Sequence, residues 1–188
     1  MIRIALVGDI GSGKSYIAKL FNYPIFNADY EVSIIYKKNK KCFKNIKKNF
    51  PNHKFSFPIK KKELVNCISN NVENLKKISK IVHPIVRSRL NLFLKRNHNK
   101  KFVILDIPLF LENKMNKKKD IIIFIQANKN QIQKRLNKRI GFNKKLVKLL
   151  RKMQLPLHIK KKKSNMFIKN NFSNKFAKKN VKYIFDNI

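Results

Sequence analysis

The chain opens with "IRIALVGDIGSGKS" at residues 2–15, where an apolar run is followed by a short loop that holds three of the chain's four glycines. An apolar run that ends in a glycine-rich segment predicts a β-strand, a tight loop and the start of a helix. The spacing matches G-x-x-x-x-G-K-[ST], whose glycines let successive backbone N–H groups turn inward around a phosphate. We therefore predict a loop that binds nucleotide phosphates; the alternative is a chance match at an ordinary turn.

Two side chains of this loop have predicted roles. Lys14 would reach the β- and γ-phosphates of a bound nucleotide, and the Ser15 hydroxyl would ligate Mg²⁺. Asp9 is unusual, because a carboxylate in such a loop repels the phosphates unless it points outward. The loop residues expected to contact ATP are Gly8, Asp9, Ile10, Gly11, Ser12, Gly13, Lys14, Ser15 and Tyr16.

Length and composition indicate a single cytoplasmic domain. A chain of 188 residues, of which 43% are hydrophobic, can bury a substantial core. No stretch approaches a membrane span, and the apolar start runs directly into the loop, so we expect neither a targeting segment nor a membrane partner. Cys42 and Cys67 show no metal-ligand or redox spacing, and two lone thiols suit packing in a reducing compartment.

The net charge of +37 would ordinarily indicate a nucleic-acid partner. Most of it comes from 39 lysines spread along the whole chain beside 25 asparagines and 25 isoleucines, a pattern more typical of a biased codon supply than of a shaped patch. The seven arginines are more informative, because planar, bidentate contacts to phosphate favour arginine over lysine. We expect no specific nucleic acid, and nonspecific electrostatic binding is the alternative.

Strand and helix patterns alternate along the chain. A strand is predicted for residues 2–7, and residues 24–36 predict a brief strand, a polar turn and a helix. Continuous apolar runs, typical of parallel strands covered on both faces, occur within 101–112 and 120–127, and 164–170 predicts a last short strand. Helical periodicity or composition marks residues 15–21, 62–96, 128–141 (closed by Gly141), 142–154 and 173–188, with short helices and loops across 37–62. This alternation predicts an α/β fold with a five-stranded parallel sheet flanked by helices, and with ligands at the carboxyl ends of its strands.

The chain has only nine acidic residues, and three of them follow predicted strands. Asp29 would lie on the same rim as the loop and could orient or deprotonate an attacking hydroxyl; a helix N-cap is the equally weighted alternative. Asp106 ends a buried strand, where a carboxylate is costly unless it is paired or near a cation such as Mg²⁺. Glu112 is as suited to holding a loop as to contacting a substrate.

Two pairs of basic residues are further candidates for the functional site. His83 precedes Pro84, which is expected to end or restart a helix, and a structural cap is the commoner role for such a histidine; Arg87 follows closely. Arg135 and Arg139 are four residues apart on one predicted helix and share a face. Beside a phosphate site such a pair can clamp the transferred group, and a solvated basic face is the alternative.

Together these segments resemble the dephospho-CoA kinase family over nearly the whole chain. The resemblance rests, beyond the loop, on motifs in the family's order: "NAD" at 27–29, "HP" at 83–84, "PLFLEN" at 108–113, "RLNKR" at 135–139, "QLPLHIK" at 154–160 and "SNMFIKN" at 164–170. The chain departs from the family where Asn27 replaces an aspartate and Ser164-Asn165 replaces Ala-Asp, which leaves open a weakened enzyme. Asp29, the acid usually assigned to the attacking hydroxyl, is retained.

The resemblance implies a fold, a reaction and a set of site residues. It implies a P-loop NTPase domain over 1–188, with a helical acceptor lobe at 28–98 and a lid at 135–163. It implies phosphorylation of the ribose 3′-hydroxyl of dephospho-CoA by ATP with Mg²⁺, in a monomer or weak oligomer. The implied catalytic residues are Lys14, Asp29 and Arg139, with Arg135 on ATP; Ser15 and Asp106 would serve Mg²⁺; the acceptor would contact Asp29, His83, Arg87, Pro108, Leu109 and Glu112.

Two other functions are compatible with parts of this pattern. A nucleoside or nucleoside-monophosphate kinase would share the loop, the sheet and the lid, although the acceptor-lobe motifs argue against it. A basic nucleic-acid-binding P-loop ATPase would bind RNA or DNA with a steep salt dependence. Neither an RNP-type aromatic cluster nor a zinc-ligand spacing supports that second alternative.

Overall fold

A computed structural model describes residues 1–69, 71–138 and 142–188. The chain divides into two compact units. The first comprises Met1–Asn27, Asn97–Asn143 and Leu150–Ile188, and the second comprises Ala28–Arg96 and Lys144–Leu149.

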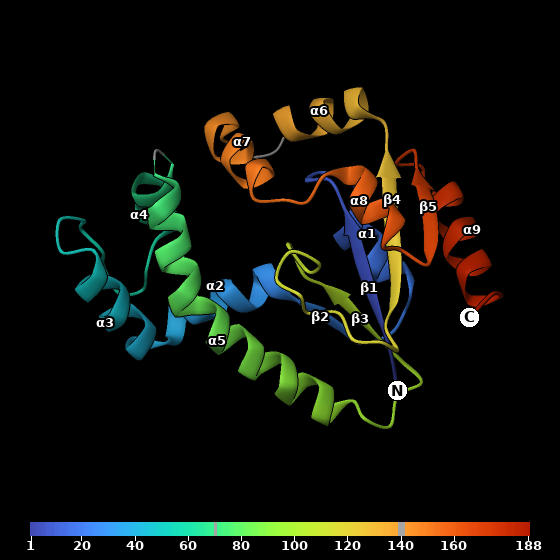
Figure 1. The fold of residues 1–188 in the computed structure, drawn as a ribbon, viewed down its shortest axis with the longest axis horizontal. Coiled ribbons are helices and arrows are strands. Elements are labelled where there is room, and N and C mark those ends of the chain that lie inside the picture. Colours follow the sequence, from blue (N-terminus) through green and yellow to red (C-terminus); the bar gives the residue numbers. More distant parts are fainter. Residues whose placement is uncertain (70, 139–141) are drawn as a thin grey trace. The chain divides into compact units, whose positions relative to one another are not determined.

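The first unit contains a parallel sheet of five strands in the described residues, drawn as arrows in Figure 1. Its order is β2-β3-β1-β4-β5, and every pairing is parallel. The strands are β1 (Ile2–Gly8), β2 (Ile25–Asn27), β3 (Phe102–Asp106), β4 (Ile121–Ala127) and β5 (Met166–Asn170). The predicted fold class, an α/β fold with a five-stranded parallel sheet flanked by helices, is therefore confirmed.

Helices α1 (Lys14–Leu20) and α9 (Asn174–Phe185) pack against this sheet and bury its main apolar core. Alternate strand residues such as Ile4, Leu6 and Ile123 face Ile17 and Val181 from these helices. Burying aliphatic side chains of this size removes about 1.5–3 kcal/mol of unfavourable hydration each, which fixes the sheet and the loops at its edge. Two more helices belong to this unit: α6 (Lys129–Asn137) and α8 (Leu157–Lys162), the latter not among the predicted elements.

The second unit is helical. It contains α2 (Ala28–Lys38), α3 (Lys40–Asn49), α4 (Lys61–Ile68) and α5 (Val72–Arg96), and α5 packs against the other three. Helix α7 (Lys144–Lys152) begins in this unit and ends in the first. None of the helices in the described ranges is long and apolar enough to cross a membrane.

Pro84 lies inside α5, so the expectation that it ends or restarts a helix is wrong. A proline removes one helical hydrogen bond and crowds the preceding turn. The helix continues because it carries buried Ile78, Val82, Val86 and Leu90 at spacings of four residues, on both sides of the proline. Burial of this stripe against the neighbouring helices outweighs the local loss.

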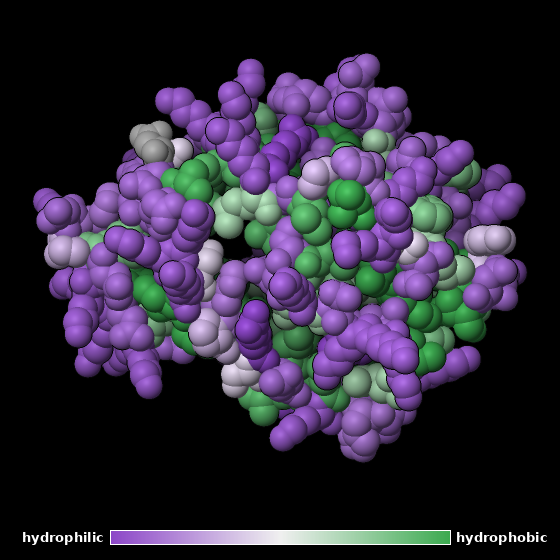
Figure 2. Space-filling model, in the orientation of Figure 1, coloured by the Kyte–Doolittle hydropathy of each residue, from purple (hydrophilic) through white to green (hydrophobic). Residues whose placement is uncertain are grey.

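The surface is dominated by charge. Figure 2 shows hydrophilic residues over most of the face in view, in keeping with 46 basic residues in the chain.

A buried ion pair lies within the sheet unit: Arg3 on β1 donates through Nε to Asp120 Oδ1 at 2.6 Å, and both residues are 8% exposed. Asp120 also accepts the backbone N–H of Lys117 at 2.8 Å.

Replacing Asp120 with Asn is expected to lower the free energy of unfolding by about 3 kcal/mol, because it leaves a buried guanidinium without its counter-charge. Urea denaturation followed by circular dichroism measures this loss. Asp186→Asn, at the end of α9, is the matched control and should change stability by less than about 0.5 kcal/mol. Equal effects of the two substitutions would show that the Arg3 pair contributes no specific stability.

Candidate nucleotide-binding site

The loop at residues 8–15 joins β1 to α1 and requires glycine at its two ends. Gly8 has φ of 149° and Gly13 has φ of 92°, backbone conformations that other residues rarely adopt. A Cβ at Gly8 would lie 2.6 Å from the carbonyl oxygen of Ile125, and one at Gly13 would lie 2.4 Å from Asn170 Nδ2. The carbonyl of Ile125 therefore leaves no room for a side chain at Gly8, and the positive φ together with the nearby Asn170 amide strongly disfavours one at Gly13.

Lys14 is the first residue of α1, and its ammonium group is held by the loop itself. Its Nζ donates to the carbonyl oxygen of Asp9 at 2.8 Å and to that of Gly8 at 3.3 Å. The charge is thereby fixed beside the backbone that would surround a phosphate. Ser15 follows it on the first turn of the helix and is exposed.

Asn170, at the end of β5, supports the other side of the loop. Its Nδ2 donates to the carbonyl oxygen of Ser12 at 2.9 Å, and its Oδ1 accepts the N–H of Phe172 at 2.9 Å. Ser12 is fully buried, and its Oγ has no hydrogen-bond partner among the described residues. Buried hydroxyls are normally paired, so this one is a polar atom of the loop that a ligand oxygen could satisfy.

The Asp9 carboxylate has hydrogen-bond partners both in the loop and at the end of α7. Its Oδ1 accepts the N–H of Ile10 at 2.7 Å. Arg151, in the last turn of α7, donates from Nε to Oδ1 at 3.3 Å and from Nη2 to Oδ2 at 3.1 Å. Sequence reasoning did not identify Arg151, because the two residues are 142 positions apart.

Asp106 ends β3 and is 4% exposed. Asn27 is its register partner on β2, and Asn27 Nδ2 donates to Asp106 Oδ2 at 2.7 Å. In the described ranges, no three His, Cys, Asp or Glu side chains gather as a metal centre. One carboxylate and the Ser15 hydroxyl still fit Mg²⁺, which binds through few protein groups and takes its other ligands from substrate phosphates and water.

Glu112 forms a largely buried ion pair with Lys160 of α8. The Lys160 Nζ lies 2.9 Å from Glu112 Oε1, and the two side chains are 3% and 11% exposed. The same carboxylate oxygen accepts the N–H of Leu155 at 2.9 Å. Together with Gly8, Lys14, Pro108 and Leu109, the pair lines a small cavity beside the loop. The sequence marked Lys160 only as part of "QLPLHIK", without a role.

Arg135 lies on α6 with its guanidinium 4.4 Å from the centre of the Phe172 ring. The Phe172 ring also approaches the loop, since a Cβ at Gly13 would lie 3.3 Å from it. An exposed arginine stacked on an aromatic ring offers a flat cationic surface to a nucleobase. Arg139, the predicted partner of Arg135, and Gly141, the predicted end of that helix, lie outside the described residues.

Three further predicted residues, Asp29, His83 and Arg87, belong to the helical unit. Helix α2 begins at Ala28, so Asp29 lies within its first turn, and the N-cap interpretation of Asp29 is wrong. His83 lies in the interior of α5, which also excludes a capping role. Burial lowers the pKa of His83, and the charge of Arg87 lowers it further. Arg87 is exposed on the same helix.

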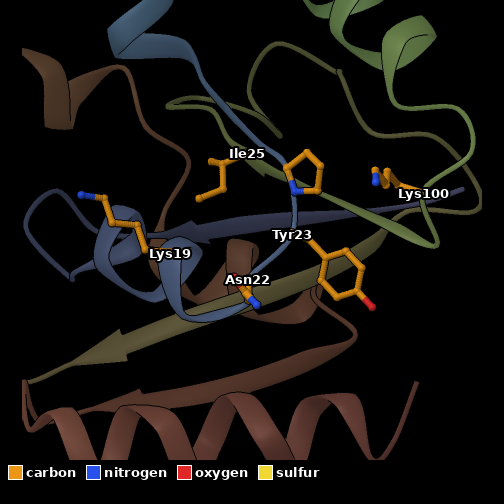
Figure 3. A pocket seen from close by; sticks show the side chains of 6 residues that line it. Lys19, Asn22, Tyr23, Ile25 and Lys100 are labelled. Carbon is orange, nitrogen blue, oxygen red and sulfur yellow. The ribbon is translucent and has the colours of Figure 1, made fainter.

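A larger cavity of about 480 Å³ lies away from this site, within the sheet unit. It is lined by Lys19, Asn22, Tyr23, Pro24, Ile25 and Lys100, and Figure 3 labels all of these except Pro24. These residues surround the amino end of β2, whereas the glycine loop follows the carboxyl end of β1. In a parallel sheet these are opposite edges, and ligands of such folds bind at the carboxyl edge. We therefore assign the nucleotide to the glycine loop and not to the larger cavity.

Comparisons with known proteins agree with this geometry. A model of the dephospho-CoA kinase family matches residues 2–175. The dephospho-CoA kinase of Wolbachia sp. subsp. Brugia malayi is 33% identical over 190 residues, which cover 98% of this chain and 97% of that protein. The dephospho-CoA kinase of Bartonella quintana is 29% identical over the same shares of the two chains.

Two solved structures resemble the chain along nearly its whole length. The crystal structure of TT1252 from Thermus thermophilus has a TM-score of 0.80 at 26% identity and covers all of this chain and 97% of that one. The dephospho-CoA kinase from Campylobacter jejuni has a TM-score of 0.65 at 22% identity, covering 98% and 96% of the two chains. At that identity the second likeness supports the fold alone.

Proposed function

Because this chain belongs to the dephospho-CoA kinase family, we propose that it transfers the γ-phosphoryl group of ATP to the ribose 3′-hydroxyl of dephospho-CoA. The observation that carries the proposal is the loop at 8–15, whose glycines adopt positive φ and whose Lys14 ammonium is held against the loop backbone. Phosphoryl transfer requires alignment and charge neutralisation, with little covalent chemistry from the protein. A backbone cradle with one fixed cation supplies both.

We assign the following roles to individual residues. Lys14 neutralises charge on the γ-phosphoryl group, Arg139 assists it, and Arg135 contacts ATP. Asp29 orients the acceptor hydroxyl and accepts its proton as the new P–O bond forms. The acceptor is further contacted by His83, Arg87, Pro108, Leu109 and Glu112.

Mg²⁺ would be held by Ser15 and Asp106, the latter oriented by its hydrogen bond from Asn27. A bound Mg²⁺ would offset the negative charge of the phosphates. The serine hydroxyl and the carboxylate would each offer an oxygen ligand, and Mg²⁺ takes its other ligands from phosphate oxygens and water. Because Asn27 is neutral where the family has an aspartate, the site is less negative than in the family. Ser15 and Asp106, the two proposed Mg²⁺ ligands, are still present.

The segments are proposed to divide the work. Residues 28–98 bind the acceptor, and residues 135–163 act as a lid whose closure excludes water, the competing acceptor. We further propose that the protein is cytoplasmic and works as a monomer or weak oligomer, without a specific nucleic-acid partner.

A panel of acceptors tests the proposal. With ATP and Mg²⁺, dephospho-CoA is expected to give stoichiometric ADP and CoA, identified by mass, whereas nucleosides, nucleoside monophosphates and shikimate give none. A parallel reaction with RNA tests the nucleic-acid alternative, which expects polymer-stimulated ATP hydrolysis with a steep salt dependence. Phosphorylation of a nucleotide without phosphorylation of dephospho-CoA would refute the assignment.

A further inference from the structure

The ion pair between Asp9 and Arg151 joins the phosphate loop to the end of α7. Both oxygens of the carboxylate face nitrogens of one guanidinium, at 3.3 Å and 3.1 Å. The Asp9 side chain is 16% exposed and that of Arg151 is 40% exposed. The carboxylate is additionally fixed by the N–H of Ile10 at 2.7 Å. The Asp9 carboxylate is therefore held between the loop backbone at Ile10 and the guanidinium of Arg151.

This arrangement matters for a polyanionic ligand. Lys14 contributes one positive charge to the loop and Asp9 contributes one negative charge, so together these two side chains are neutral. Arg151 restores a net charge of +1 beside the loop. Without it, an unpaired carboxylate would adjoin the phosphates, and like charges brought together in this way oppose binding.

The chemistry of the pair requires arginine at this position. A planar guanidinium donates two parallel hydrogen bonds to a carboxylate, whereas an ammonium acts as a point charge. The backbone around Arg151 is also anchored, since Gln154 N donates to its carbonyl oxygen at 3.0 Å and Leu155 N donates to Glu112 at 2.9 Å. The Arg151 side chain therefore extends from a backbone segment that hydrogen bonds hold in place.

We infer that Arg151 is a positioning residue for ATP binding, which acts by neutralising Asp9, and that Asp9 in turn holds the end of α7 at the rim of the loop. The inference rests on the proposed function only in taking ATP as the ligand of the loop. Its consequence is a coupling: loss of Arg151 is harmful because Asp9 is present, and becomes nearly harmless once Asp9 is replaced by a neutral residue.

The test is a double-mutant cycle on the dissociation constant of Mg-ATP, measured by titration calorimetry. Arg151→Met is expected to weaken ATP binding about 10-fold, whereas Asp9→Asn is expected to tighten it slightly, because it removes a negative charge beside the phosphates. The double variant should bind within about threefold of the unmodified protein. Arg151→Lys should recover part of the loss, because the charge is kept while the bidentate geometry is lost.

Lys152→Met is the matched control, since it removes one positive charge from the adjacent residue of α7. It should leave the dissociation constant unchanged, which separates the Asp9 pair from a general effect of net charge. Thermal unfolding of each variant verifies the fold, and Arg151→Lys keeps the test informative if the methionine variant unfolds. At saturating ATP, turnover of Arg151→Met should stay within about threefold, because the effect lies in binding.

Two results would overturn the inference. If Arg151→Met causes the same loss whether or not the chain also carries Asp9→Asn, then Arg151 acts on the nucleotide directly. No loss from Arg151→Met would mean that the pair is a surface contact without effect on the ligand. The proposed function is judged separately: ATP binding that shows the coupling, in a protein that does not phosphorylate dephospho-CoA, would refute the substrate and leave the inference standing.

Discussion

Lys14→Met is expected to lower the turnover number by about 10³-fold, equivalent to about 4 kcal/mol of transition-state stabilisation. Methionine fills a similar length but carries no charge, so the developing charge on the γ-phosphoryl oxygens would lose its fixed counter-charge. The Lys14 ammonium is already held by two loop carbonyls, so little reorganisation is needed when a nucleotide binds. ADP formation at saturating ATP and dephospho-CoA measures the effect.

The control for this experiment lies on the same helix. Lys19 is exposed in the last turn of α1, and Lys19→Met removes the same charge and adds the same side chain. Its turnover should stay within about twofold of the unmodified protein, because an exposed charge of this kind is screened by solvent and salt. Turnover of Lys14→Met within tenfold of normal would contradict the assignment of the loop to the transferred phosphate.

The loop could be predicted because its structure is specified locally. Glycine at positions 8, 11 and 13 permits the positive φ angles that the loop adopts, and the apolar run before it can only be a buried strand in this context. The parallel sheet followed from continuous apolar runs such as that at 121–125. The order of the strands in the sheet, by contrast, could not be predicted. The insertion of β3 between β2 and β1 depends on pairing between distant segments, which residue patterns do not encode.

The partners of the site residues could not be predicted for a similar reason. Lys160 is one of 39 lysines, and nothing in its neighbourhood distinguishes it until the fold buries it against Glu112. Arg151 is likewise separated from Asp9 by most of the chain. From charge alone, the sequence indicates that a carboxylate at Asp9 repels phosphates unless it points outward, but it does not identify Arg151 as the partner of that carboxylate.

Substitution of Asp29 is expected to affect turnover much more than ATP binding. Asp29→Asn should lower turnover by about 10²–10³-fold while the dissociation constant of ATP changes less than about threefold. The amide has the same shape but cannot accept the proton of the acceptor hydroxyl. Asp29 lies in the first turn of α2, two residues beyond the end of β2, so its substitution leaves the sheet and the loop at 8–15 intact. Single-turnover kinetics with bound ATP measures the chemical step directly.

Glu31→Gln is the matched control for Asp29→Asn, because Glu31 is the other acid in the first turn of α2. Both substitutions remove a negative charge that favours the start of that helix, by about 0.3–1 kcal/mol. Glu31 also pairs with Arg89 of α5, so its replacement is the more disruptive of the two for the helical unit. If both variants lose turnover together with stability, or if ATP affinity falls in parallel with turnover in Asp29→Asn, then Asp29 supports the helix and another group receives the proton.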